Sequence, residues 1–130
     1  MKMEHLGIQV QAPLEMAEWY CSHLGFKLMR QQTASPFTAF IADSSGSVML
    51  EIHHHLDVAL PDYAQTDPLV QHLAFDVGDE PVESAAQRLL AAGASLAKPL
   101  VVTASGDRLM MLRDPWGLAV QLVKRAERMV

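Results

Sequence analysis

The stretch HLGIQV at positions 5–10 returns as HLAFDV at positions 72–77, an offset of 67 residues. Three further pairs of markers repeat in the same order, with offsets of 68, 70 and 71 residues. They are Pro13 and Gly25 with Pro81 and Gly93, then Glu51 with Gln121, then DSSG at 43–46 with DPWG at 114–117. Because the offset drifts by only four residues, the pattern indicates that one structural unit has been duplicated within the chain.

Each copy predicts the element order βαβββ. Apolar and polar residues alternate along 5–10, which is typical of a strand with one buried face. Pro13 is well placed to begin a helix, and Gly25 to end it. Further strands are expected near 27–33, 37–42 and 47–54 in the first copy, and near 70–77, 95–100, 108–113 and 118–124 in the second, whose helix runs over 81–92.

We therefore expect an α+β fold of two tandem βαβββ modules, forming a half-open mixed β-barrel with the helices outside. The predicted boundaries are about 3–55 for the first module, 56–69 for a linker with two prolines, and about 70–124 for the second module. A tail at 125–130 completes a single domain over 1–130.

Composition narrows the classes of function. The 130-residue chain is 50% apolar with a net charge of −5, and it carries no basic stripe, so we expect no nucleic-acid partner. Its apolar runs stay below about 18 residues, so we expect no membrane span. No secretory segment is expected before the first strand, and Cys21 is the only cysteine, which fits a reducing cytoplasm.

The alternation also predicts which side chains share the exposed face of each sheet. With the apolar residues under the helices, this face carries His5, Glu51, His72 and Gln121 at matched positions of the two copies. Imidazole nitrogens and carboxylate or amide oxygens suit Zn, Ni, Co, Fe(II) or Mn, and the residues do not choose among these metals. The sequence therefore predicts a site for a divalent metal ion.

Paired βαβββ modules, a histidine in the first strand of each and Glu or Gln in the fourth resemble the vicinal-oxygen-chelate superfamily. This superfamily includes glyoxalase I, methylmalonyl-CoA epimerase, extradiol dioxygenases, and fosfomycin- and bleomycin-resistance proteins. The segment RDPWGLAVQL at 113–122 resembles its closing turn and strand, and the resemblance covers about residues 3–124. It implies that His5, Glu51, His72 and Gln121 are metal ligands.

The chain departs from glyoxalase I at the last of these positions. Glyoxalase I usually has there a glutamate that serves as the catalytic base, whereas Gln121 cannot accept a proton. Glu51, at the matched position of the first copy, is then the candidate base. The resemblance implies a metal-dependent glyoxalase-type lyase or isomerase, acting on a small substrate that chelates the metal through neighbouring oxygens. Two alternatives remain: an Fe(II) extradiol-type dioxygenase, and a metal-free binding protein like those that confer bleomycin resistance.

Five further residues are candidates for contact with the substrate. Arg108 follows a turn-prone segment and carries a cation that suits a carboxylate. The others, His53, Phe40, Met110 and Trp116, are polar or bulky side chains that could line a pocket. A glutathione adduct is among the candidate substrates, and the resemblance also implies a homodimer.

Overall fold

A computed structural model describes residues 1–129 and divides the chain into two compact units, Met1–Pro61 and the chain from Asp62 onward. In the first, strand β1 (His5–Gln9) is followed by helix α1 (Pro13–Leu24), β2 (Lys27–Gln31), β3 (Ala39–Ala42) and β4 (Met49–His53). In the second, β5 (Leu73–Asp76) is followed by α2 (Val82–Ala91), β6 (Ser95–Val102), β7 (Arg108–Arg113) and β8 (Ala119–Lys124). The predicted α+β class and the βαβββ order of each copy are confirmed.

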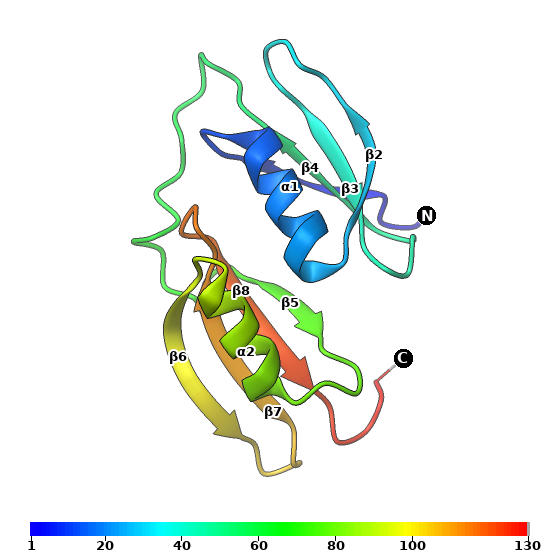
Figure 1. Cartoon of the computed structure of the whole chain (residues 1–130), viewed down its shortest axis with the longest axis vertical. Helices are drawn as coiled ribbons and strands as arrows, with labels where there is room; N and C mark the ends of the chain where they lie inside the picture. The colour runs from blue at the N-terminus through cyan, green and yellow to red at the C-terminus, as the bar shows by residue number, and fades with distance from the viewer. Residues whose placement is uncertain (130) are drawn as a thin grey trace. The chain divides into compact units, whose positions relative to one another are not determined.

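The two sheets have the same topology. The first has the strand order β1-β4-β3-β2 and the second β5-β8-β7-β6. In each, the first strand pairs in parallel with the fourth, and the remaining pairs are antiparallel. Each unit places its helix across one face of its own sheet (Figure 1). The other face of each sheet is therefore the one that its own helix leaves uncovered.

Helix α1 begins and ends where its sequence predicts. Pro13 lies in its first turn, and Gly25 adopts a left-handed conformation with φ of 74°. The amide of Gly25 donates to the carbonyl of Tyr20. Met16 and Tyr20 are fully buried, and the Tyr20 ring lies edge-on to Phe26 at 5.6 Å between ring centroids. The packing of this apolar stripe directs the helix onto Ile41 and Ile52 and so determines which sheet face stays open.

Helix α2 differs slightly from the prediction. It ends at Ala91, before the predicted end at Ala92. Val82, Ala85 and Leu89 are buried, and Leu90 is 37% exposed. The buried residues of α2 are three or four positions apart and form one stripe that faces the sheet. Leu90 lies just outside this stripe.

Strand β5 is shorter than the predicted 70–77. A turn precedes it, in which the amides of Val70 and Leu69 donate to the carbonyl and carboxylate of Asp67. His72 consequently lies immediately before β5 instead of within it. Among residues 1–129, neither helix is long and apolar enough to cross a bilayer.

The turn between β7 and β8 joins the start of the second unit to its sheet. Arg113 donates through Nη1 to the carbonyl of Tyr63 at 2.7 Å and through Nη2 to the carbonyl of Thr66 at 2.8 Å. The buried Asp114 carboxylate accepts from the amides of Trp116 and Leu118, both at 2.9 Å. Arg113, at the end of β7, therefore holds the segment before β5 by hydrogen bonds to its backbone.

Candidate functional site

In the first unit, a row of polar side chains lies on the open face of the sheet. The parallel register pairs His5 with Met49, Gly7 with Glu51, and Gln9 with His53. Paired residues on neighbouring strands share a face, so the alternation predicted from the sequence is confirmed by the register. Ile8 and Ile52, from the intervening positions, are buried on the opposite face.

His5 and Glu51 converge on this face. Nε2 of His5 lies 3.3 Å from Oε2 of Glu51, and Nδ1 of His5 contacts the carboxylate of Glu4. The Phe40 ring packs edge-on to the His5 ring, with 5.8 Å between centroids. The hydrogen bond to Glu4 raises the pKa of His5, partial burial opposes this rise, and the Glu51 charge adds to it.

The distance within this pair is compatible with the predicted divalent metal ion. Donor atoms about 2.0–2.2 Å from a tetrahedral metal ion lie about 3.3–3.6 Å from each other. The observed 3.3 Å between His5 Nε2 and Glu51 Oε2 falls in that range.

Both histidines of the predicted donor set are held through Nδ1. In the second unit, Nδ1 of His72 lies 2.7 Å from the carbonyl oxygen of Pro68. A carbonyl only accepts, so Nδ1 of His72 is the donor, and in the neutral tautomer with this donor Nε2 carries the lone pair. The Glu4 carboxylate has the same relation to His5. Metal-binding histidines are commonly oriented in this way, by an oxygen on the nitrogen that does not bind metal.

Gln121 lies in β8, opposite Ala74 of β5 and Met111 of β7. The three side chains share the face of the second sheet that α2 does not cover, and Gln121 itself is half-buried. Each unit thus carries two of the four predicted donors. Within residues 1–129, three or more His, Cys, Asp or Glu side chains are nowhere gathered as a candidate metal site.

His53 extends the polar row of the first unit. Its Nε2 lies toward Gly7, and its Nδ1 is buried without a hydrogen-bond partner. Burial lowers the pKa of His53, Glu51 opposes this, and His55, with its ring centroid 4.8 Å away, adds to the lowering. Neighbouring Gln9 is buried and donates to the carbonyl of Val58 at 2.7 Å, so it is a structural residue of the row.

The remaining candidates for substrate contact do not all share these faces. Arg108 and Met110 pair with Lys124 and Leu122, which places them on the face that α2 covers, and Arg108 forms an ion pair with Glu83. They therefore do not share the face of Gln121, which Met111 does. Trp116 lies in the β7–β8 turn, and Phe40 contacts His5 as described.

Sequence reasoning missed the two groups that hold the histidines. Glu4 directly precedes His5, and that adjacency was the available signal. The Pro68 carbonyl has no signal in the sequence, because every residue has a backbone carbonyl. Only the turn at Asp67–Val70 brings this carbonyl to His72. Gly7 was also missed as a residue with a possible role of its own.

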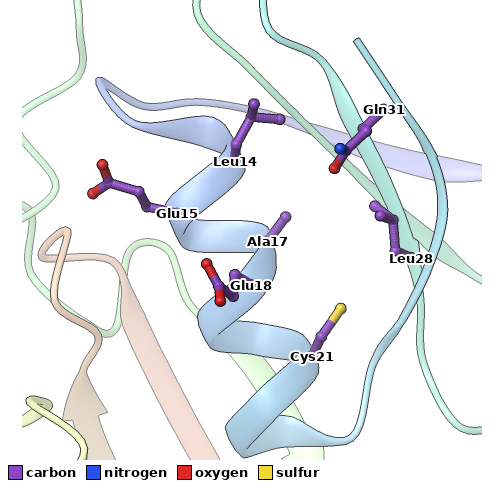
Figure 2. Close-up of a pocket in the computed structure, with 7 residues that line it drawn as sticks. All are labelled: Leu14, Glu15, Ala17, Glu18, Cys21, Leu28 and Gln31. Atoms are coloured by element: carbon purple, nitrogen blue, oxygen red, sulfur yellow. The ribbon is translucent and has the colours of Figure 1, made fainter. Parts of the chain in front are cut away.

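A separate pocket of about 410 Å³ lies on the helix side of the first unit. Leu14, Ala17 and Cys21 of α1 face Leu28 and Gln31 of β2 across it (Figure 2). Burial raises the pKa of the Cys21 thiol, and a hydrogen bond with the Leu28 backbone opposes the rise. Because His5 and Glu51 lie on the other face of the same sheet, this pocket is not part of the donor site.

The whole-chain comparisons agree with this architecture. The sequence matches the Glyoxalase/Bleomycin resistance protein/Dioxygenase superfamily over residues 2–122, and the chain therefore belongs to that family. None of the curated proteins searched matches it.

Solved structures share the fold at low sequence identity. A glyoxalase family protein from Bacillus cereus is 16% identical with a TM-score of 0.82, and the match covers 98% of this chain and 95% of that one. TnmS3, an antibiotic binding protein from Streptomyces sp. CB03234, is 16% identical with a TM-score of 0.72, with 97% of each chain covered. A glyoxalase/bleomycin resistance protein/dioxygenase family enzyme from Burkholderia phytofirmans PsJN is 17% identical with a TM-score of 0.73. The match covers 96% of this chain and 99% of that one. At these identities the likeness shows the fold alone.

Proposed function

We propose that this protein is a metal-dependent lyase or isomerase of the glyoxalase type, with His5, Glu51, His72 and Gln121 as its metal donors. One observation carries the proposal. Both histidines have Nδ1 against an oxygen atom, and in the first unit the other ring nitrogen, Nε2 of His5, lies 3.3 Å from the Glu51 carboxylate. Histidines that bind a metal through one ring nitrogen usually have the other ring nitrogen hydrogen-bonded to an oxygen in this way.

The donor set defines the chemistry available. A bound divalent metal would polarise a substrate carbonyl and orient two neighbouring oxygens. Two imidazoles, one carboxylate and one neutral amide fit Zn, Ni, Co, Fe(II) or Mn. The substrate class is therefore a small molecule with oxygens on adjacent carbons, of which the adduct of a ketoaldehyde with a thiol such as glutathione is one example.

Glu51 is the group that would move the proton. Its carboxylate can remove a proton from the carbon beside a carbonyl and return it to the neighbouring carbon, so that the net reaction is an isomerisation. Gln121 cannot do this, because a carboxamide has no proton-accepting state near neutral pH. The base would thus belong to the first unit, in contrast to the usual position in glyoxalase I.

Paired substitutions test this assignment. Glu51→Gln in the metal-loaded protein should lower kcat by at least about a hundredfold, the usual contribution of a positioned base. Gln121→Glu restores the usual glyoxalase I residue and should retain or raise activity with methylglyoxal and a thiol. A Glu51→Gln variant that keeps full activity would remove Glu51 from the role of base.

Two other measurements, O2 consumption and ligand binding with and without chelator, separate the competing functions. A dioxygenase would consume O2 only with reduced iron, and a metal-free binding protein would bind its ligand equally well before and after chelator treatment. We also propose a homodimer in the cytoplasm, which sedimentation and cell fractionation would check.

A further inference from the structure

Gly7 lies in the middle of β1, opposite Glu51, where its own conformation does not require glycine. A glycine in the interior of a strand costs about 0.5–1 kcal/mol relative to alanine. Six glycines of the described chain have a positive φ, and Gly7 is not among them. Backbone geometry thus gives no reason for the missing side chain.

Crowding gives no reason either. A Cβ built at Gly7 would lie 3.6 Å from His53 Nε2 and 3.7 Å from Glu51 Oε2, which are ordinary van der Waals contacts. The duplication provides an internal comparison, because Ala74 pairs with Gln121 in the same parallel register. The fold accepts a methyl group at this position in the second unit, and the first unit omits it beside its carboxylate.

Two polar groups of β4 lie next to the position that a Cβ at Gly7 would take. They are Glu51 Oε2, the oxygen 3.3 Å from His5 Nε2, and His53 Nε2. Nδ1 of His53 is buried without a partner. An unpaired N–H in that position would cost about 1–3 kcal/mol, which favours the tautomer with the proton on Nε2. The donor of His53 is then on the nitrogen that lies nearest to Gly7.

We propose that the missing side chain at Gly7 makes room for the substrate, which lies over Gly7 beside Glu51 and His53 and accepts a hydrogen bond from His53 Nε2 on one of its oxygens. This inference rests on the proposed function, adds Gly7 to it and gives His53 a specific role. Because Gly7 has no side chain, a substrate carbon can approach the Glu51 carboxylate. His53 favours substrates that have an oxygen acceptor within hydrogen-bond distance of its Nε2.

A strand glycine can also mark a place where another backbone approaches closely. That explanation predicts a different response to Gly7→Ala, because a methyl group would then push packed chains apart. The variant would lose stability or change its oligomeric state. If the space belongs to the substrate, the free protein should instead keep its unfolding temperature or gain slightly from the lower entropy of the unfolded chain.

The experiment uses acetohydroxamate, a small chelator with two neighbouring oxygens, titrated into the cobalt-loaded full chain and followed by visible absorption. Gly7→Ala should bind cobalt within about twofold of wild type but acetohydroxamate at least about tenfold more weakly, the loss expected when a site contact is blocked. His53→Ala should weaken acetohydroxamate in the same direction. His54→Ala, the neighbouring control, should leave it unchanged.

Unchanged acetohydroxamate binding in Gly7→Ala would overturn the inference, as would a lower unfolding temperature or altered mass of that variant. The proposed function fails separately, if wild-type protein takes up no cobalt. In that case the backbone amide resonance of Glu51, the register partner of Gly7, decides the inference in the metal-free chain. A saturable shift with acetohydroxamate that Gly7→Ala weakens supports it, and no shift overturns it.

Discussion

Gly117→Ala should be strongly destabilising, because two independent costs meet at this residue. Gly117 adopts a φ of 87°, and a Cβ there would lie 2.9 Å from the backbone nitrogen of Ala64 and 3.0 Å from its Cβ. Arg113 holds the carbonyls of Tyr63 and Thr66 on either side of Ala64. The segment that would have to move is therefore fastened to the same turn.

Gly25→Ala provides a matched control for the conformational part of that cost. Gly25 has a φ of 74°, and a Cβ there would meet nothing within 4 Å. Left-handed strain of about 1–2 kcal/mol, less about 0.4–1 kcal/mol from the more ordered unfolded chain, predicts a net loss near 1 kcal/mol. Gly117→Ala adds overpacking of about 1–3 kcal/mol, for a total of about 2–4 kcal/mol.

Urea unfolding of wild type and both variants measures these differences. The midpoint should fall further for Gly117→Ala than for Gly25→Ala, and the excess is the contribution of the Ala64 contact. Equal losses in the two variants would refute the reasoning, because they would show that the segment at Ala64 yields without cost. An unchanged denaturant slope is required for the comparison.

Two further predictions concern titrating groups. Burial raises the pKa of Cys21 above 9.0, so iodoacetamide should modify this thiol more slowly in the native chain than in urea. The rate in the native chain should still rise with pH above 9.0. Equal rates in the native and urea-unfolded chain at about pH 8 would contradict this prediction. The Ala126 amide and the Arg125 guanidinium lower the pKa of Asp107 below 3.8. The ionised Asp107 carboxylate should stabilise the fold fully above pH 3.8 and lose this effect as the pH falls through its lower native pKa. Wild-type protein should therefore have a lower unfolding temperature at about pH 3 than at about pH 6, and Asp107→Asn should make this difference smaller. An equal difference in wild type and variant would contradict that second prediction.

The fold was predictable because the duplication shows each signal twice. The alternation around His5 and around His72 predicts which face of each sheet is polar, and the helix ends follow from proline and glycine at matched positions. The register confirms the consequence in the first unit, where Gly7 pairs with Glu51. Element boundaries moved by a few residues where turns, such as Asp67–Val70, compete with strand pairing.

The parts of the site that sequence did not reveal depend on tertiary geometry. Arg108 was a candidate for substrate binding, but its ion pair with Glu83 is made across the helix-covered face, a pairing between residues far apart in sequence. Met110 and Met111 are adjacent, so only the register with Gln121 shows which of them shares its face. The carbonyl that orients His72 has no residue signature at all.

The central claim is that the two oriented histidines bind metal, and metal analysis of the full chain tests it most directly. Tag-free protein purified without chelator, or reconstituted with Zn, Ni, Co, Mn or Fe(II), should contain about one metal ion per chain. His5→Ala and His72→Ala should each lose most of that metal, while His54→Ala should retain it. No uptake by wild-type protein, or equal metal content in all three variants, would contradict the account.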